Sequence, residues 1–558
     1  MSRLEEQLKQ YAESGVYPMH MPGHKRLLPP VSDLPYQWDV TEVPGTDDLH
    51  DAEGILADAM KRTAHLYGAA RTFYLVGGST CGILAGIRAM MLAGARRKRA
   101  AAAYLAGSQD DAVFKEKNST DASAGGSQSA TRPTLIIARN CHRSVFHAVE
   151  LTGARVCWIE PEEDARFEIC RGITAEQVRE ALAICPEAMG VVLTSPTYEG
   201  VLSDIPEIAK VCHEAGVPLM VDEAHGAHLG LFERDYFPDG ALGSGADIVI
   251  QSAHKTLPSL TQTAWLHLGR MDWMADAPAE NAGVLNSAED LHQEISRQLD
   301  VFETSSPSYP LMVSLDGCTE LLLTQGEEIF RQWKETLQRF YGIARNLKCL
   351  EVLTDSSLPS SEMEKDGFGA ALHDPSKILI NGRRAGLTGA HLAQLLREDY
   401  GFETEMSCGY NVLAMTGAGD DPTAIERFGQ AILEIDGKCF SREIRPETQE
   451  GASEAEIIDA FGTTASQDVH RHAQPYFGEL TILDAVSRPS EEVPEAESCD
   501  RICAEYVYCY PPGVPVLIPG EKITQEKLNR IESLRDSGTR IRRSAGDREQ
   551  MLLCVISS

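Results

Sequence analysis

One lysine of the chain stands where its amine could act as a nucleophile. The segment DIVIQSAHKT (247–256) is apolar up to its last residues, and Ser252, His254 and Lys255 follow the apolar part. A lysine directly after a buried strand is partly desolvated, which lowers the pKa of its amine and makes the amine nucleophilic. Because SAHKT does not resemble a solvated charged face, we expect Lys255 to form a Schiff base with a carbonyl group.

A carboxylate ends another apolar segment, VPLMVD (217–222). Asp222 at that position is costly unless a cation or a hydrogen-bond donor accompanies it. The pyridinium nitrogen of pyridoxal 5'-phosphate (PLP) is one such partner, because an adjacent carboxylate keeps this nitrogen protonated. Two alternatives stay open at this point. Asp222 could accept hydrogen bonds from a loop, or it could ligate a metal together with His225 and His228.

Two further segments place polar side chains next to apolar ones. In VGGSTCGI (76–83), Gly78 lets the backbone approach a ligand, and Ser79 and Thr80 supply hydroxyls. The N-terminus of the helix expected after them favours an anion, although such a turn could equally well only cap the helix. In ARNCHRS (138–144), His142 follows the apolar stretch TLIIA and could lie on the face of a cofactor ring. Together with Lys255 and Asp222, these segments predict a PLP site.

The elements that must position these residues alternate between short apolar runs and helix-like stretches. We expect strands at 134–139, 154–159, 190–195, 217–222 and 247–252, and helices near 143–152, 174–184 and 205–215. Apolar strands separated by helices predict an α/β fold with a mostly parallel sheet that is covered on both faces. In such sheets ligands bind beyond the carboxyl ends of the strands, which is where the candidate residues stand.

The length of 558 residues predicts more than one domain. We expect a large domain at 1–310, interrupted at about 96–133 by a surface insertion rich in Ser, Ala, Gly and Thr that has little to bury. A smaller α+β domain is expected at 311–440. Its expected elements are helices at 319–347, 389–398 and 422–435 and strands at 377–382 and 411–419. After a polar linker, Pro-Pro-Gly and Pro-Gly turns predict a small, separate C-terminal module at 450–558.

The charge balance limits the partners. Lys and Arg number 51 and Asp and Glu number 83, so the formal net charge is −32. Such a surface repels nucleic acid and anionic membranes and mildly favours cationic small molecules. The 14 cysteines form no CxxC pair, and no run of 18 apolar residues or signal peptide is present. We therefore expect a cytoplasmic protein with reduced thiols that binds neither nucleic acid nor a membrane.

These motifs, with several others, resemble a known family. The matching stretches are YPMHMPGHKR (17–26), GTDDLH (45–50), VGGSTCGI (76–83), RNCHRS (139–144), SPTYEGVLSDI (195–205), VDEAHGAHLG (221–230), SAHKTLPSLTQ (252–262), ETSSPSYPLMVSLD (303–316) and YPPGVPVLIPGE (510–521). They are similar to the Orn/Lys/Arg decarboxylases, PLP enzymes with the aspartate-aminotransferase-like fold (fold type I). The chain looks like the shorter members, which have no N-terminal wing domain, and 96–133 looks like an insertion relative to them.

The resemblance implies roles for individual residues. Lys255 would carry PLP, Asp222 would contact its ring nitrogen, and His142 would stack on the ring. The residues implied at the phosphate end of the cofactor are Gly78, Ser79, Thr80, Ser252 and His254. Ser305 or Ser306 would reach the cofactor of the neighbouring subunit, which implies a homodimer with active sites at the subunit interface. His225 would lie in the loop on the cofactor side, and Glu521 would help to shape the substrate entrance.

The function implied by the resemblance is the decarboxylation of lysine, arginine or ornithine to an amine and CO2, which serves polyamine synthesis or acid tolerance. Another fold type I reaction, such as transamination, is the nearest alternative and would need an arginine for the substrate carboxylate, with Arg383 or Arg384 as candidates. The presence of Lys255 weakens the metal alternative. A regulatory paralogue that only binds partners is disfavoured, because Lys255, Asp222 and His142 are all present.

Overall fold

The computed structural model describes most of the chain. The described residues are 3–14, 34–107, 132–274, 288–354, 373–444, 473–509, 513–536, 538–546 and 550–556, and the side chains of 95–107 and 288 are not described. The YPMHMPGHKR motif, residues 445–472 of the polar linker expected at about 441–473, and residues 510–512 of the C-terminal motif lie outside these ranges. None of the helices among the described residues combines the length and the apolarity needed to cross a bilayer.

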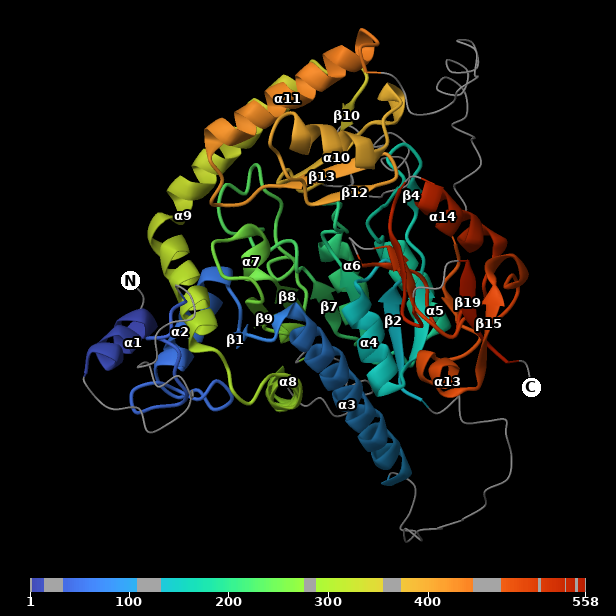
Figure 1. Ribbon diagram of the computed structural model, residues 1–558. Coiled ribbons are helices and arrows are strands. Elements are labelled where there is room, and N and C mark those ends of the chain that lie inside the picture. Colours follow the sequence, from blue (N-terminus) through green and yellow to red (C-terminus); the bar gives the residue numbers. More distant parts are fainter. Residues whose placement is uncertain are drawn as a thin grey trace.

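A mostly parallel sheet forms the centre of the large domain (Figure 1). Its strand order is β1-β9-β8-β7-β6-β2-β3-β14, and β9 and β14 run antiparallel to their neighbours. The strands are β1 (Arg71–Leu75), β2 (Thr134–Ala138), β3 (Arg155–Ile159), β6 (Val191–Thr194), β7 (Leu219–Asp222), β8 (Ile248–Gln251), β9 (Ala264–Leu268) and β14 (Tyr476–Phe477). Every residue of β2, β7 and β8 is buried, as expected of strands covered on both faces. The predicted α/β fold is confirmed.

Helices belong to the layers around this sheet. They are α3 (Gly78–Gly107), α4 (Arg143–Thr152), α5 (Ala175–Ile184), α6 (Ile205–Glu214) and α8 (Ala288–Phe302). Three of them, α4, α5 and α6, begin after a residue whose side chain caps them. The hydroxyl of Thr174 accepts from the Gln177 amide in a capping box before α5, and Asp204 caps α6. The large domain also contains α1 (Arg3–Glu13), α2 (Ile55–Tyr67), β4 (Glu163–Asp164), β5 (Ile169–Cys170) and the 3-10 helix η2 (Asp272–Met274).

The first part of the expected insertion is regular structure. Helix α3 continues to Gly107, well past residue 96, where we expected the insertion to begin. The alanine-rich composition of this stretch explains the continuation, because alanine has the highest helix propensity. The remaining residues of the expected insertion up to 131 lie outside the described ranges.

The small domain lies over the large domain and is joined to it by a long helix. Figure 1 shows α9 (Tyr309–Ala344) running along one side of the molecule from the large domain to the small domain. The four-stranded antiparallel sheet of the small domain has the order β10-β11-β13-β12. The remaining elements are β10 (Glu351–Val352), β11 (Lys377–Asn381), η5 (Arg383–Ala385), α10 (Gly389–Glu398), β12 (Met406–Cys408), β13 (Asn411–Met415) and α11 (Pro422–Phe440).

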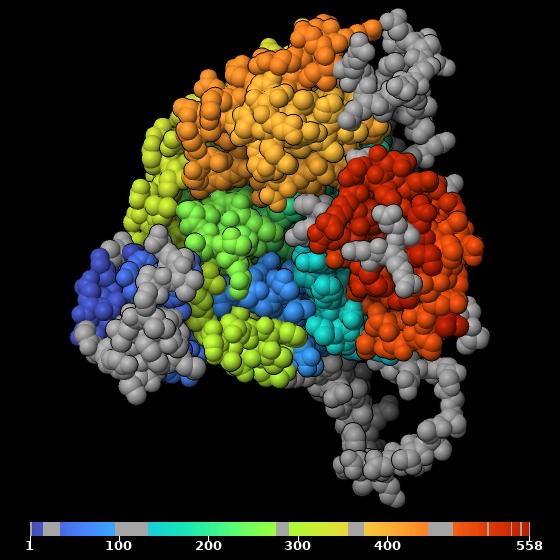
Figure 2. All heavy atoms as spheres, viewed as in Figure 1, coloured from blue at the N-terminus to red at the C-terminus, as the bar shows by residue number. Residues whose placement is uncertain are grey.

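The C-terminal region packs on the large domain, beside the small one (Figure 2). It contains the sheets β15-β19 and β17-β16-β18, and its first strand, β14, extends the central sheet by pairing with β3. The module is therefore less separate than its turns suggested. Its elements are α13 (Ile482–Ser487), β15 (Ser490–Pro494), η6 (Glu495–Glu497), β16 (Val507–Cys509), β17 (Pro515–Leu517), α14 (Gln525–Asp536), β18 (Ile541–Arg543) and β19 (Met551–Val555).

A buried ion pair joins this region to the sheet. Arg139, directly after β2, donates from Nε to Glu521 Oε1 at 2.8 Å and from Nη2 to Oε2 at 3.0 Å. Lys527 Nζ lies 2.7 Å from the same carboxylate. Burial opposes the ionisation of Glu521, but Arg139 and Lys527 together lower its pKa to about 2. Within one chain, the Glu521 side chain is thus occupied by this junction.

Replacing Glu521 by glutamine should destabilise the junction by about 3 kcal/mol at pH 7, because it leaves a buried arginine with a neutral partner. The carboxylate has a depressed pKa in the folded state, so its contribution is complete above its unfolded pKa of about 4.5 and is lost as the pH falls through about 2. The difference in urea midpoint between wild type and Glu521→Gln should therefore be smaller at pH 3.5 than at pH 7. An equal difference at both values would contradict this assignment.

Candidate active site

The candidate residues meet at the carboxyl ends of the strands of the central sheet because of the strand register. Asp222 pairs with Ile250 of β8, and Gln251 pairs with Trp265 of β9. Trp265 is also the partner of Tyr74 in β1. The carboxyl ends of β1, β7 and β8 therefore point the same way, with β9 between β1 and β8, and the segments that follow these strands carry the candidate side chains.

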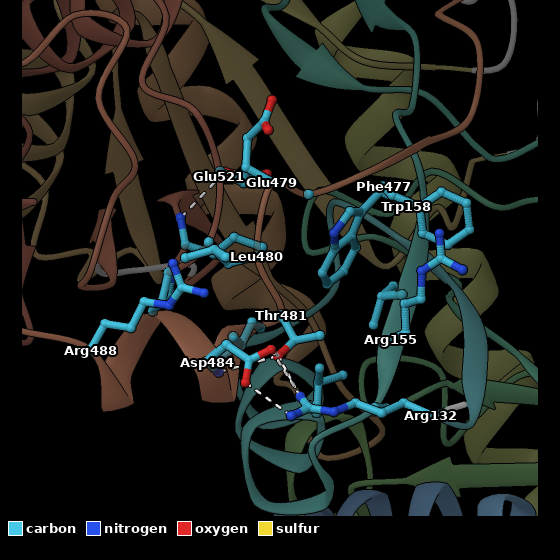
Figure 3. A pocket seen from close by; sticks show the side chains of 18 residues that line it. Arg132, Arg155, Trp158, Phe477, Glu479, Leu480, Thr481, Asp484, Arg488 and Glu521 are labelled. Atoms are coloured by element: carbon cyan, nitrogen blue, oxygen red, sulfur yellow. Dashed lines mark hydrogen bonds and ion pairs between the residues drawn. The ribbon is translucent and has the colours of Figure 1, made fainter. Parts of the chain in front are cut away.

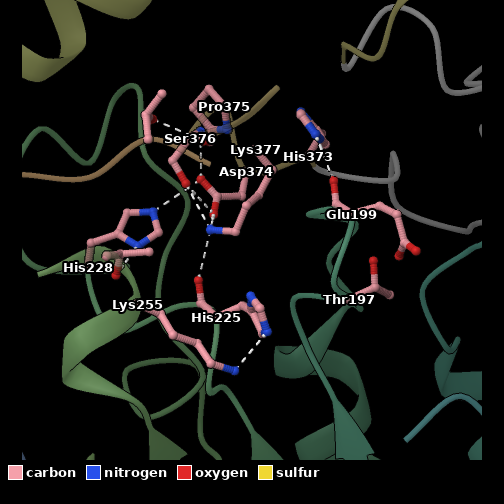
Figure 4. Close-up of polar contacts among 12 residues, drawn as sticks. Thr197, Glu199, His225, His228, Lys255, His373, Asp374, Pro375, Ser376 and Lys377 are labelled. Atoms are coloured by element: carbon pink, nitrogen blue, oxygen red, sulfur yellow. Dashed lines mark hydrogen bonds and ion pairs between the residues drawn. The ribbon is translucent and has the colours of Figure 1, made fainter. Parts of the chain in front are cut away.

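Lys255 lies in the short helix α7 (Ala253–Thr256) directly after β8. Its Nζ is 2.9 Å from Nε2 of His225, whose loop follows β7 (Figure 4). Burial lowers the pKa of the Lys255 amine, although the Asp222 carboxylate acts in the opposite direction. The Lys255 amine is thus poorly solvated and has a hydrogen-bond partner, as a nucleophilic lysine requires.

Asp222 is a buried carboxylate with few partners. It is 2% exposed, and Oδ1 accepts a hydrogen bond from the amide of Ala224 at 3.1 Å. Burial raises its pKa, while Lys255 and the Ala224 amide lower it. Asp222 thus accepts one hydrogen bond from its own loop, which is part of the alternative in which a loop satisfies this carboxylate. A buried carboxylate in this position, close to a desolvated lysine, is suited to keep the ring nitrogen of PLP protonated.

The opposite end of the site contains donors for an anion. Gly78 has φ +79°, a conformation that other residues rarely adopt, and it begins α3, so that Ser79 and Thr80 lie in the first turn. The Ser252 hydroxyl is buried and has no hydrogen-bond partner within the described structure. An unpaired buried hydroxyl is costly, so this orphaned group fits a phosphate ligand. His254 uses Nδ1 to contact the carbonyl oxygen of Thr263 at 2.9 Å, which leaves Nε2 for a ligand.

His142 caps helix α4. Its Nδ1 accepts a hydrogen bond from the amide of Ser144 at 3.3 Å, and the Ser144 hydroxyl lies 2.8 Å from the same nitrogen. Burial, followed by the charge of Lys255, lowers the pKa of His142 to about 3. The imidazole is therefore neutral at ordinary pH, and a neutral aromatic ring is suited to stacking on another ring.

The three side chains of the metal alternative point to different partners. His225 faces Lys255, and its ring centroid lies 4.6 Å from that of Tyr198. His228 directs Nε2 to Asp374 at 3.1 Å and Nδ1 toward Thr256 at 3.3 Å. With its two nitrogens directed to these groups, His228 has none left for a metal shared with Asp222.

The two arginines considered for transamination also contact other groups. Both belong to η5 in the small domain. Arg383 pairs with Glu168 and lies over the ring of Tyr410, while Arg384 pairs with Glu351 at 3.1 Å. Both guanidinium groups thus have a carboxylate partner within the chain.

The loop that carries Ser305 and Ser306 is anchored to the glycine-rich turn. Both serines are exposed between α8 and α9. Glu303, the residue that opens the ETSSPSY motif, accepts from the amides of Val76 and Gly77 at 3.1 and 3.0 Å. The motif contains Glu303, but its sequence does not single out this residue, because the partners of Glu303 are backbone groups far away in the chain.

A separate cavity opens where the edge of the central sheet meets the C-terminal region (Figure 3). Its volume is about 560 Å³, and its lining includes Arg155, Phe477 and Glu521 but none of the candidate PLP ligands. Arg132 crosses it and donates to both oxygens of Asp484, at 3.0 and 2.9 Å. The Arg155 guanidinium carbon lies 3.6 Å from the centroid of the Phe477 ring. Two cations of the lining, Arg132 and Arg155, thus already have partners within the chain.

Comparisons with known proteins agree with the geometry. The family model described as the major domain of Orn/Lys/Arg decarboxylases matches residues 127–424, and that of the C-terminal domain matches residues 478–543. "Uncharacterized protein YaaO" of Bacillus subtilis is 30% identical over 99% of this chain and 98% of its own length. An arginine decarboxylase of the same organism is 29% identical over 95% of this chain and 93% of its own length. The constitutive lysine decarboxylase of Escherichia coli is 23% identical over 72% of this chain and 62% of its own.

A solved structure shows the same fold. The crystal structure of the Francisella novicida lysine decarboxylase LdcF superimposes with a TM-score of 0.71. The match covers 100% of this chain and 81% of that one, at 18% sequence identity.

Proposed function

The chain belongs to the Orn/Lys/Arg decarboxylase family, a family of PLP-dependent carboxy-lyases, and from this premise we propose that it removes the α-carboxylate of a basic amino acid. One observation carries the proposal. A largely buried lysine amine, Lys255, follows the strand β8 next to the strand that ends in the buried carboxylate Asp222. We further propose that PLP is attached to Lys255.

The remaining candidates would hold the cofactor. Asp222 would contact the ring nitrogen and keep it protonated, and the neutral ring of His142 would lie on the cofactor face. The groups proposed for the phosphate are the hydroxyls of Ser79, Thr80 and Ser252, the first amides of α3 beside Gly78, and His254. When bound, PLP supplies a sink for the electron pair that the departing CO2 leaves behind.

The chain's own groups would manage the protons. Decarboxylation replaces the carboxylate on Cα by a proton, so that one proton is consumed for each CO2 released. Lys255 is the proposed donor, since a lysine that exchanges with the substrate amine stays close to Cα. His225 would hold Nζ in place through the 2.9 Å contact, and burial keeps the pKa of His225 well below its ordinary value. It thus acts as a neutral partner rather than as a competing cation.

The substrate class is proposed from the family and from the surface charge. The relatives are described as arginine and lysine decarboxylases, and a net charge of −32 favours the approach of cationic amino acids. We propose a homodimer in which the Ser305 and Ser306 loop of one subunit reaches the cofactor of the other. Such an enzyme in the cytoplasm would serve polyamine synthesis or acid tolerance.

A panel assay tests this proposal. The purified protein with PLP should release CO2 from at least one of L-lysine, L-arginine and L-ornithine, and the corresponding amine should accumulate in equal amount. Formation of a 2-oxo acid without CO2 would favour transamination. Release of CO2 only from acidic or aromatic amino acids would overturn the assignment of the substrate class.

A further inference from the structure

A cluster of charged side chains is buried between the small domain and the active-site loop (Figure 4). Lys377, the first residue of β11, and Asp374 are both 0% exposed, and their ion pair measures 3.0 Å. His228, also 0% exposed, contacts the other oxygen of Asp374 at 3.1 Å. The sequence of 377–382 predicts a strand but no role for this cluster.

Lys377 also contacts the loop that follows β7. Its Nζ donates to the backbone carbonyl oxygen of His225 at 3.0 Å. The imidazole of the same residue lies 2.9 Å from the Lys255 amine. A single residue, His225, thus separates the buried ammonium group from the proposed cofactor lysine.

The packing leaves Lys377 little freedom. Gly200 lies so close that a Cβ atom added to it would be 2.8 Å from Cβ of Lys377. The carbonyl oxygen of Gly200 accepts from the amide of Asp374 at 2.8 Å. The stem of Lys377 is therefore packed against the backbone of Gly200, and its ammonium group is held by the backbone carbonyl of His225.

The hydrogen bonds define the charges of the cluster. Lys377 Nζ has three acceptors, which are the Asp374 carboxylate, the Ser376 hydroxyl at 3.0 Å and the His225 carbonyl, as an ammonium group requires. Burial alone would raise the pKa of Asp374, but His228 and Lys377 hold it well below its ordinary value. Burial lowers the pKa of His228, so this ring donates from Nε2 as a neutral group.

We infer that Lys377, held by Asp374, is a positioning residue for the proposed reaction, because it fixes the loop that carries His225 and places a positive charge beside Lys255. This inference rests on the proposed function. A cation fixed at this position opposes a second positive charge on the neighbouring amine, so it favours the unprotonated amine that can attack a carbonyl carbon.

Several groups act on Lys255 together. The charged and titratable groups that face it are Asp222 after β7, His225 in the next loop, His142 before α4, His254 in α7, Glu405 before β12, and Lys377. Asp222 and Glu405 raise the pKa of the amine, whereas burial and Lys377 lower it. Because the three histidines have lowered pKa values and are neutral, Lys377 is the cation in this set that acts against protonation of Lys255.

Lys377→Met, which keeps an unbranched side chain of similar length and removes its charge, tests the inference. In the holoenzyme, the pH at which the visible absorbance of the bound cofactor changes should rise by about one unit. Lys377→Arg keeps the charge and should leave this midpoint near that of the wild type. In the cofactor-free chain, the pH for half-maximal labelling of Lys255 by acetic anhydride, followed by peptide mass spectrometry, should shift in the same direction. A tenfold or larger fall in kcat with little change in KM is expected to accompany the shift.

The controls separate positioning from stability. Arg543→Met breaks a similarly buried pair with Glu505 in the C-terminal region and should lower Tm without moving either midpoint. If Lys377→Met folds poorly, the double variant Lys377→Met/Asp374→Asn removes both buried charges and should raise the midpoint by less than Lys377→Met, because the negative charge of Asp374 is removed together with the positive one. A lower Tm with unchanged midpoints in a folded Lys377 variant would overturn the inference. If the wild type shows no cofactor absorbance, the proposed function fails instead, and labelling of the cofactor-free chain still tests the role of Lys377.

Discussion

Lys255→Ala is expected to abolish turnover and the visible absorbance that borohydride removes. The structure places no second candidate for this role: Lys377 is the other lysine near the site within the described residues, and its Nζ already donates to three acceptors. Without a lysine at position 255, PLP has no amine to which it can attach covalently, and the proposed proton donor for Cα is lost as well. We expect kcat to fall by at least about 10³-fold, because the variant loses the nucleophile and the acid–base group together.

An exposed lysine provides the matched control. Lys210 lies on α6 of the same domain with 62% of its side chain exposed, and Lys210→Ala should leave turnover and absorbance unchanged. Peptide mapping of the borohydride-reduced wild type should find the cofactor on the peptide that contains Lys255. A Lys255→Ala protein that kept its absorbance and rate would mean that another residue carries the cofactor, and the proposed site would have to be abandoned.

Much of the fold was predictable because local signals agree with the tertiary structure. The predicted helix at 143–152 and strand at 134–139 correspond to α4 and β2, and the predicted helix at 389–398 corresponds to α10. In each case an apolar run or an amphipathic stretch is bounded by a residue that ends it, such as Thr388, which caps α10. Helix α9 begins ten residues earlier than predicted, at Tyr309, because burial of Tyr309 and Met312 outweighs the weak helix propensity of Gly317.

The sequence does not predict those strands that contain polar residues or are very short. β9 contains His267, which reads as a surface residue but is 0% exposed, and its two nitrogens contact Thr72 of β1 at 2.8 Å and Gln251 of β8 at 3.0 Å. A polar residue can lie inside a sheet when neighbouring strands satisfy it, and that pairing is invisible to local periodicity. The strand β14 has two residues, and its pairing with β3 depends on contacts far apart in the sequence.

The site was predictable to the extent that it follows strand ends. Asp222 ends an apolar run, and Lys255 and His142 follow shortly after one, so the rule for parallel sheets predicts all three at the carboxyl ends of the strands. Lys377 and Asp374 could not be found in this way, because besides each other they contact His225 and His228, which lie far away in the sequence and in a different domain. A lysine and an aspartate flanking a strand usually indicate a solvated edge, and only the tertiary structure shows that both are fully buried.

Asp222→Asn is expected to lower kcat by about 10² to 10⁴-fold while PLP remains covalently attached. Asparagine preserves the shape of the side chain but not the charge that would keep the ring nitrogen protonated, so the electron sink is weakened. Attachment depends on Lys255 rather than on Asp222, so the visible absorbance should persist, with a changed maximum. Asp222→Ala should also lower kcat, and by a larger factor, since it also removes the hydrogen bond from the Ala224 amide.

Asp247 distinguishes this effect from the general cost of altering a buried aspartate. Its carboxylate is also 2% exposed, but it precedes β8 at the opposite edge of the sheet, where it accepts from the amide of Leu219 at 2.8 Å and from Trp273 at 2.7 Å. Asp247→Asn should therefore lower Tm and leave kcat unchanged per molecule of folded enzyme. If Asp222→Asn behaved in the same way, losing stability but keeping its rate, then Asp222 would act only as a structural acceptor for its own loop. The ring nitrogen would then need another partner, because a buried carboxylate next to it could not be neutralised without slowing the chemistry.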